Sequence, residues 1–225
     1  MDTIILHLET TTKVCSVALS KNGCLLAIKE IEEEGYSHGE NLNLFCEEVC
    51  KEGKVTMSEL TAISVASGPG SYTGLRIGAA TAKSLCYALD IPLIAIDSLT
   101  CLIELAKDKH SEINFCALID ARRMEVYNLF MDKSGSHLKG ISADIIDEDS
   151  YKNYEPFVYF GDGAMKLQEV WKYRDCQIDD TIKSSASGQI QIAIKKFNNS
   201  EFEDVAYWEP FYLKDFIAGI KKKTS

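Results

Sequence analysis

The residues of this chain that could do chemistry gather first in a glycine-rich segment. Residues 67–78 read Ser-Gly-Pro-Gly-Ser-Tyr-Thr-Gly-Leu-Arg-Ile-Gly and follow an apolar run at 62–66 that predicts a buried strand. Ser71 is a good helix N-cap, and the next proline is Pro92. A strand, a glycine turn and a helix in this order expose backbone N–H groups that can bind an anion. The segment therefore has the layout of a phosphate-binding loop.

The side chains of this segment do not fit a nucleotide-binding loop. Leu75 and Arg76 follow Gly74, where the P-loop pattern requires a lysine and then a serine or threonine. Lysine first appears at Lys83, two helical turns later. We therefore expect a tight turn that starts a helix, in which Gly74 and Gly78 allow a second helix to pack closely.

Two carboxylates at predicted strand ends form the second candidate site. The residues around Asp120 (116–127) repeat the pattern around Glu9 (7–14), and similar turns follow at 132–135 and 20–23. This repetition predicts two copies of one unit. Glu9, Thr10 and Asp120 are then candidates for a vestigial nucleotide cleft between the copies, or else polar residues that end buried strands.

Other catalytic groups lack the required spacing. No two of the four histidines (His7, His38, His110, His137) are four residues apart, so we expect neither a metal site nor a zinc protease. The sequence Gly70-Ser71-Tyr72-Thr73-Gly74 is not the G-x-S-x-G elbow of a serine hydrolase. The eight cysteines include no CxxC pair and are expected to be reduced. We expect no catalytic residue in this chain.

The composition narrows the classes of partner. The chain has 225 residues, 46% hydrophobic content and a formal net charge of −10, which opposes unassisted binding to a phosphate backbone. It begins without the charged and apolar regions of a signal peptide and contains no apolar run of about 20 residues. We expect a cytoplasmic protein that has no membrane contact and does not bind nucleic acid by itself.

The hydrophobic pattern alternates strands with helices, which predicts an α/β fold with mainly parallel sheets. We expect an N-terminal domain at 1–107, completed by a C-terminal helix within 212–225, and a smaller C-terminal domain at 108–211. The expected strands are 4–8, 14–19, 24–31, 62–66, 93–96 and 157–160, and the expected helices are 38–51, 72–89, 98–107, 164–173, 188–197 and 212–223.

Several segments together resemble the bacterial TsaB (YeaZ) family. They are the opening Leu8-Glu9-Thr10-Thr11-Thr12, the glycine segment 68–78, Ile119-Asp120-Ala121-Arg122-Arg123-Met124-Glu125-Val126-Tyr127, Gly161-Asp162-Gly163-Ala164 and Pro210-Phe211-Tyr212-Leu213. The resemblance implies the actin, sugar-kinase and heat-shock ATPase (ASKHA) fold in two apposed domains, the second reduced. This family usually has aspartate where the chain has Glu9, which weakens a nucleotide role for that position.

The same resemblance implies a non-catalytic subunit in the synthesis of threonylcarbamoyladenosine in tRNA. Such a subunit binds and activates a TsaD-type transferase together with a TsaE-type ATPase, and it pairs with itself when the transferase is absent. It implies no cofactor for this chain alone, although ATP or ADP could lie at the interface with the partner. With the acidic charge of the chain, it also implies only indirect contact with tRNA.

The first two helices carry the expected partner surface. Their apolar and small faces either complete the core or form a helix-bundle interface, and the family favours the interface. The expected partner-binding residues are Leu42, Phe45, Cys46, Val49, Tyr72, Leu75, Arg76, Gly78, Ala79, Ala82 and Lys83. The alternative function is a small ATP-dependent kinase or ATPase of the same fold, for which Glu9, Asp120 and the glycine turns would form the site.

Overall fold

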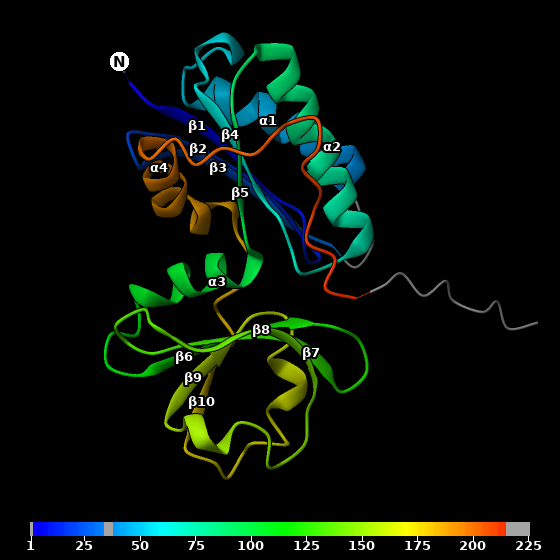
Figure 1. The fold of residues 1–225 in the computed structure, drawn as a ribbon, viewed down its shortest axis with the longest axis vertical. Helices are drawn as coiled ribbons and strands as arrows, with labels where there is room; N and C mark the ends of the chain where they lie inside the picture. The colour runs from blue at the N-terminus through cyan, green and yellow to red at the C-terminus, as the bar shows by residue number, and fades with distance from the viewer. Residues whose placement is uncertain (1, 34–37, 215–225) are drawn as a thin grey trace, which may run out of the picture.

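The computed structural model describes residues 2–33 and 38–214 and contains two five-stranded sheets stacked along the long axis of the molecule (Figure 1). The first sheet has the strand order β3-β2-β1-β4-β5, and the second has the order β10-β9-β6-β7-β8. Each sheet combines an antiparallel meander with parallel strands. We call the first sheet with its helices the first half and the second sheet with its loops the second half.

The first sheet starts with the predicted meander. β1 (Ile4–Glu9) and β3 (Cys24–Glu32) pair antiparallel with β2 (Val14–Lys21). On the other side of β1, β4 (Ala62–Ala66) and β5 (Leu93–Ile96) add in parallel, because helices connect them across the sheet. The expected strands of this half are confirmed.

Helices α1 (His38–Glu52) and α2 (Tyr72–Leu89) cover one face of the first sheet. Side chains alternate along the strands, so this face carries Leu6 and Leu8, which pack in one core cluster with Leu42 and Ala82. The core on this face also contains four cysteines, all free thiols, at positions 15, 46, 50 and 86.

Helix α4 (Ile190–Asn198) covers the opposite face of the first sheet. Ala193 packs there against Ile5, Ala62 and Ile94, whose side chains point away from α1 and α2. The 3-10 turn Ala186–Gln189 leads into this helix. The first half is therefore completed by residues that come almost 100 positions after its last strand.

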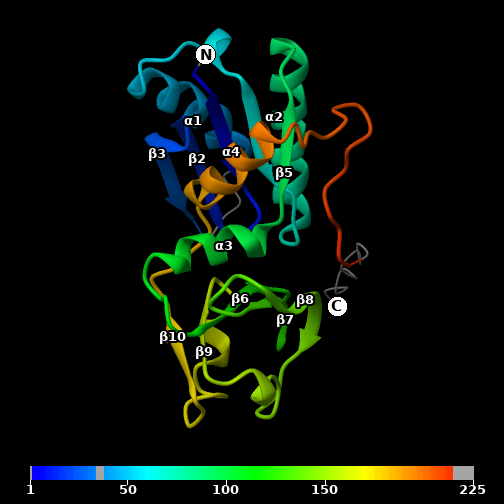
Figure 2. The same cartoon turned by 60° about the vertical axis from the view of Figure 1, so that its left-hand side comes forward.

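The second sheet contains β6 (Asn114–Asp120), β7 (Glu125–Met131), β8 (His137–Ile145), β9 (Phe157–Phe160) and β10 (Cys176–Asp179). Helix α3 (Ser98–Lys107) lies between the two sheets and packs on one face of the second through Leu102 and Ala106 (Figure 2). An aromatic cluster around Trp171 fills the other face.

The helix expected over 164–173 is wrong. Only the 3-10 turn Met165–Leu167 forms there, and the amides of Ala164, Leu167 and Gln168 bond to carbonyls three residues earlier. The apolar residues with helical spacing still fill the core, since Ala164, Leu167 and Trp171 are buried together. The periodicity thus identified the buried face, whereas the backbone is wound more tightly than an α-helix.

The domain boundaries differ from the expected ones in one respect. The second sheet lies within 114–179, and residues 186–214 return to the first half instead of staying with 108–211. Residues 201–214, which we call the strap, run along α2, and Val205 and Trp208 pack on the first core (Figure 1). Of the helix expected at 212–223, residues 212–214 are not helical and the rest lies outside the described residues. In the described part of the chain, no helix is long and apolar enough to cross a membrane.

Candidate functional site

The glycine segment starts α2 as the sequence predicted. Ser71 is the N-cap, and its hydroxyl oxygen accepts a hydrogen bond from the amide of Gly74 at 3.2 Å. Gly68 has φ +111° and lies against the strap, because a Cβ there would stand 2.6 Å from the carbonyl oxygen of Phe211. The turn is therefore fixed on two sides by other parts of the chain.

The row of glycines packs against the turn after β1, not against a second helix. A Cβ on Gly74 would lie 1.9 Å from the carbonyl oxygen of Thr10, and one on Gly78 would lie 2.5 Å from the Thr10 hydroxyl. A Cβ on Gly70 would meet the carbonyl oxygen of Thr11 at 2.4 Å. The expectation that Gly74 and Gly78 serve packing between helices is corrected, since the chain's own backbone occupies that space.

Hydrogen bonds join the two turns further. The amide of Ser71 donates to the carbonyl oxygen of Thr11 at 2.7 Å, and the Thr10 hydroxyl donates to the carbonyl oxygen of Gly74 at 2.8 Å. The start of α2, the cap and the end of β1 thus form one packed unit. Thr10 holds α2 in place in this structure.

Glu9 begins this turn and is fully buried. Its Oε1 accepts hydrogen bonds from the amide of Thr11 at 2.7 Å and from the Thr11 hydroxyl at 2.5 Å. Its Oε2 is buried and has no hydrogen-bond partner among the described residues. The pKa of Glu9 is raised to about 7, mainly by burial and to a smaller extent by the nearby carboxylates of Asp162 and Glu30, while the hydrogen bonds from Thr11 act in the opposite direction.

The second half contributes Asp162 to this region. Asp162 accepts a hydrogen bond from the amide of Asp120 at 3.0 Å. The pKa of Asp162 is raised to about 6, mainly because surrounding protein atoms desolvate its carboxyl and also because Asp120 is close. The residue as a whole is still exposed to water on one side. Asp162 is the second-half carboxylate that raises the pKa of Glu9.

Asp120, the expected partner of Glu9, is exposed and turned to other groups. It forms an ion pair with Lys166 and accepts a hydrogen bond from the amide of Arg122. Asp162 was not among the expected site residues, although its segment Gly161-Asp162-Gly163-Ala164 is one of those that carry the family resemblance. The glycines on both sides of Asp162 could have indicated that this segment packs closely on another part of the chain. In the structure a Cβ on Gly163 would lie 2.9 Å from the backbone of Ile119, at the end of β6.

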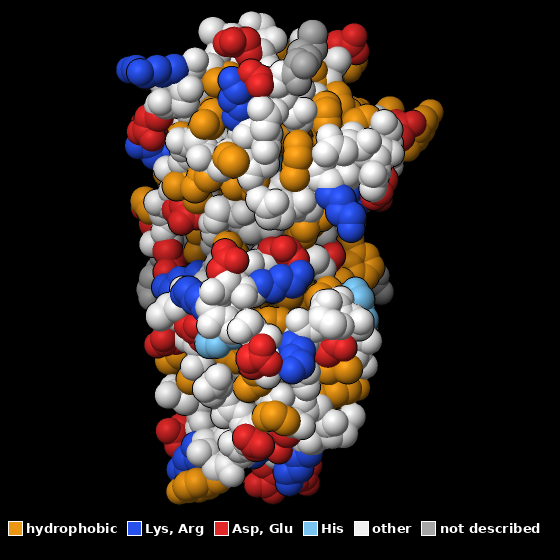
Figure 3. Space-filling view, turned by 90° about the vertical axis from the view of Figure 1, so that its left-hand side faces the viewer, with side chains coloured by type: hydrophobic (Ala, Val, Ile, Leu, Met, Phe, Trp, Pro, Cys, Tyr) orange, Lys and Arg blue, Asp and Glu red, His pale blue; other side chains and the backbone are white. Residues whose placement is uncertain are grey.

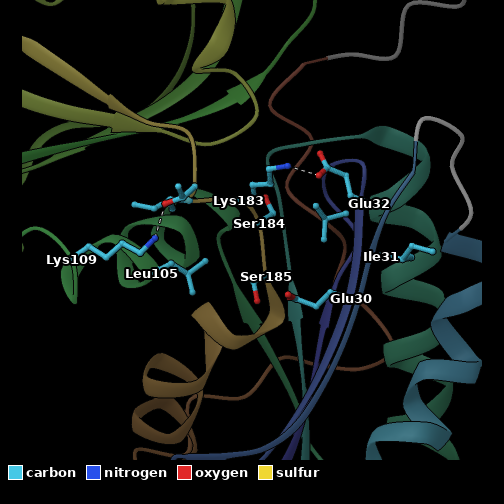
Figure 4. A pocket seen from close by; sticks show the side chains of 11 residues that line it. Glu30, Ile31, Glu32, Leu105, Lys109, Lys183, Ser184 and Ser185 are labelled. Atoms are coloured by element: carbon cyan, nitrogen blue, oxygen red, sulfur yellow. Dashed lines mark hydrogen bonds and ion pairs between the residues drawn. The ribbon is translucent and has the colours of Figure 1, made fainter.

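A cavity of about 380 Å³ opens between the halves near the connection from β10 to α4 (Figure 4). Glu32 and Lys183 face each other across it as an ion pair, and Lys109 donates to the Thr181 hydroxyl at 2.7 Å. Figure 3 shows acidic and basic side chains mixed at mid-height on one side of the molecule. The cavity's remaining lining residues are Val14, Glu30, Ile31, Leu105, Ile182, Ser184 and Ser185.

Most of the expected partner-binding residues are core residues. In this structure they cannot touch a partner, because their side chains pack on the first sheet or on the turn after β1. The buried members of the set are Leu42, Cys46, Val49, Leu75, Gly78, Ala79 and Ala82.

The other four members lie at or near the surface. Phe45 is partly buried, and Arg76 is exposed, with its guanidinium 4.2 Å from the ring centre of Tyr72. Lys83 donates to the carbonyl oxygens of Ala206 at 3.2 Å and Trp208 at 3.0 Å, so it fastens the strap to α2.

A different row of α2 faces solvent. We call it the outward row. Its exposed members are Ala80, Ser84, Tyr87 and Ala88, and the partly buried Ile77, which also packs on the first core, continues the row toward the start of the helix. Tyr87 is 86% exposed, and Leu44 on α1 is 49% exposed. None of these positions belongs to the expected partner-binding set.

Three of the four histidines have structural partners. His7 lies between the hydroxyls of Ser64 at 2.6 Å and Ser20 at 2.7 Å, and burial lowers its pKa to about 3. His38 bonds to the carbonyl oxygen of Thr12, and His110 bonds to Asp179. Within residues 2–33 and 38–214, no group of three or more His, Cys, Asp or Glu residues could hold a metal ion.

Two apposed sheets, each with a meander and parallel strands, and a carboxylate turn facing the other half define a protein of the ASKHA class. A sequence model of the tRNA N6-adenosine threonylcarbamoyltransferase (TsaD) family matches residues 32–220. The chain belongs to this family, and its relatives place it in the TsaB (YeaZ) branch.

The relatives in this branch are tRNA threonylcarbamoyladenosine biosynthesis proteins TsaB. The Escherichia coli protein is 26% identical over 95% of this chain and 96% of its own length. The Haemophilus influenzae protein is 35% identical over 55% of this chain and 51% of its own, and the Bacillus subtilis protein is 33% identical over 58% and 56%. These last two alignments thus span about half of each relative.

Solved structures show the same fold. YeaZ from Pseudomonas aeruginosa superposes with a TM-score of 0.81 at 24% identity and covers 94% of this chain and 100% of that one. The activator of 2-hydroxyisocaproyl-CoA dehydratase from Clostridium difficile, solved with bound ADPNP, has a TM-score of 0.50 at 12% identity and covers 89% and 96%. The expected fold class is confirmed.

Proposed function

We propose that this chain is a non-catalytic subunit that binds and activates a TsaD-type transferase during the synthesis of threonylcarbamoyladenosine in tRNA. The observation that carries this proposal is the outward row of α2. An exposed helix that keeps small and apolar side chains on its solvent side offers a surface that a second helix can cover. Family membership gives the kind of partner, because this chain and the transferase share one fold.

The outward row suits a helix of similar shape. Ala80 and Ser84 lie one turn apart, so a partner backbone can come close at the middle of the row, with Ile77 at one end and Tyr87 at the other. Leu44 on α1 is a further exposed apolar side chain. The buried residues that we first expected at the interface contribute by holding α1 and α2 on the sheet.

The wider assembly follows from the same proposal. A TsaE-type ATPase would join the complex, and ATP or ADP would bind at an interface shared with the partner. In the absence of the transferase, two copies of this chain would pair through the outward row. The location would be the cytoplasm, where tRNA is modified.

The buried carboxyl of Glu9 favours a second candidate, a small ATP-dependent kinase or ATPase. Its Oε2 has no partner among the described residues and lies near Asp162, as a ligand-binding group between two halves would. Calorimetry of the isolated chain with ATP and Mg²⁺ separates the candidates. Submillimolar binding with one site per chain supports the enzyme, and no binding supports the subunit.

Co-purification with the TsaD-type transferase of the same organism tests the leading proposal. We expect a complex at micromolar concentration that Ala80→Glu and Ser84→Glu weaken at least about tenfold, because each buries an unpaired charge in the interface. Gln191→Glu, on α4 at the opposite face of the sheet, is the matched control and should leave the complex intact. Equal binding by all variants contradicts the proposed surface.

Reconstitution tests the function itself. Modification of an unmodified tRNA should need this chain beside the transferase and the ATPase, and Ala80→Glu should lower it in proportion to lost binding. Full modification without this chain would refute an activating role.

A further inference from the structure

The turn between β6 and β7 carries two adjacent arginines in an unusual conformation. Arg122 and Arg123 have φ values of 71° and 51°, in the left-handed region that non-glycine residues avoid. The amide of Glu125 donates to the carbonyl oxygen of Arg122 at 3.2 Å, which closes the turn. Glycine or asparagine would suit these positions better, so the presence of two arginines suggests that their side chains are used.

The carboxylates beside this turn are paired with lysines. Asp120 forms an ion pair with Lys166, and Glu125 forms one with Lys214. In the part of the chain that the structure describes, the side chains of Arg122 and Arg123 consequently form no hydrogen bond or ion pair.

The other two arginines of the chain differ in this respect. Arg76 bonds to the Tyr72 hydroxyl, and Arg174 bonds to Glu155 and lies over the ring of Trp171. Two free guanidinium groups side by side are thus a local feature of a chain whose formal net charge is −10.

The turn lies next to the proposed partner-binding helix. Lys214, at the end of the strap, contacts Glu125, while Tyr212 packs against Tyr72 at the start of α2 with ring centres 5.0 Å apart. The exposed side chains of Met124, Ile145 and Met165 belong to the same end of the second half, since Ile145 pairs with Glu125 across β7 and β8. The strap thus joins the arginine turn to the first turn of α2, the helix on which we place the transferase.

We propose that Arg122 and Arg123 contact the phosphate backbone of tRNA when this chain is in complex with the transferase. The inference rests on the proposed function and goes beyond it, because only indirect contact with tRNA was expected. A guanidinium donates two parallel hydrogen bonds to a phosphate, whereas the negative charge of the whole chain opposes binding by the chain alone. The partner brings the RNA, and the two arginines then bind part of its backbone.

Binding of an unmodified tRNA transcript to the assembled complex tests this inference. The variant Arg122→Glu/Arg123→Glu should weaken tRNA binding roughly tenfold or more, and the slope of log affinity against log salt should become shallower by about 2. The milder Arg122→Gln/Arg123→Gln should change both quantities in the same direction. The control Lys152→Glu/Lys172→Glu makes the same charge change at exposed lysines of the second half and should change neither.

Pull-down of the transferase by each variant separates the outcomes. Retained transferase with unchanged tRNA affinity and salt slope refutes the inference but not the proposed function. If the arginine variants lose the transferase while the lysine control keeps it, the turn contacts an acidic protein surface. That outcome also refutes the inferred contact with tRNA. If the wild-type chain binds no transferase, the proposed function fails and this inference fails with it.

Discussion

The carbonyl oxygen of Thr10 occupies the position that a side chain on Gly74 would need. A Cβ there would stand 1.9 Å away, closer than any real contact. The first turn of α2 can therefore rest on the end of β1 only if residue 74 is glycine. This contact sets the angle at which α2, and with it the outward row, leaves the sheet.

Gly74→Ala should destabilise the protein by about 3 kcal/mol, because either the helix or the turn must shift to admit the methyl group. Gly39→Ala is the matched control in α1, where a Cβ would meet nothing within 4 Å. Urea unfolding of both variants gives the comparison. Equal stability would mean that α2 moves away from Thr10 without cost.

Glu9→Gln should remove a pH dependence of stability. The folded protein keeps the Glu9 proton up to a pKa of about 7, whereas the unfolded chain releases it near its ordinary value of 4.5. Below pH 4.5 the protonated Glu9 carboxyl makes its full contribution to the stability of the folded protein. As the pH rises from 4.5 to the folded pKa of about 7, this contribution falls by roughly 1.4 kcal/mol per pH unit. Glutamine cannot titrate, so its unfolding free energy should change less over this window.

Urea unfolding from about pH 5 to about pH 8 measures the Glu9 effect. Glu47→Gln, exposed on α1, is the control and should behave as the wild type does. His7 acts in the opposite direction, because its pKa of about 3 makes the folded protein lose stability as the pH falls below 6.5. A Glu9→Gln profile parallel to that of the wild type would show that Glu9 is ionised in the folded protein.

Gln189→Leu should cost about 2 to 4 kcal/mol, since it leaves two buried groups without a partner. Gln189 accepts a hydrogen bond from the Ser64 hydroxyl at 2.6 Å and donates one to the carbonyl oxygen of Leu8 at 2.8 Å. Gln177→Leu on the exposed side of β10 is the control. Similar midpoints of thermal unfolding for the two variants would contradict the structural role of Gln189.

Lys83→Met should loosen the strap without unfolding the protein. The substitution keeps the apolar stem and removes the hydrogen bonds to Ala206 and Trp208. Hydrogen exchange should become faster in 204–212, while β1 and β4 stay protected. The variant Lys195→Met on α4 should exchange as the wild type does. Unchanged exchange of the strap in Lys83→Met would show that its packing contacts, such as those of Val205 and Trp208, hold it without the lysine.

The strands and helices of the first half could be predicted because their patterns are local. The alternation in β1 to β3 and the cap at Ser71 each depend on residues close in sequence. The fold class followed from the order of the elements, and the ASKHA assignment came from the family resemblance.

Periodicity could not show which row of α2 is exposed. A helix that is apolar on most sides gives no indication of which side meets its own sheet. Leu75 and Ala79 belong to the more continuous apolar row and were therefore expected at the partner surface. In the structure they are buried, and Ala80 and Ser84 face solvent instead. Likewise, Asp162 meets the region of Glu9 only through the packing of the two halves, which local sequence does not encode.

The cover that α4 provides on the first sheet has a consequence for synthesis of the chain. The sheet face of Ile5 and Ile94 is not fully covered until residues 190–198 have left the ribosome, when the second half has already emerged. The second half can therefore reach its native packing first, although the first half is made earlier. Until then an apolar sheet face is open to chaperones, and a truncation before Ile190 should accumulate as chaperone-bound or aggregated protein.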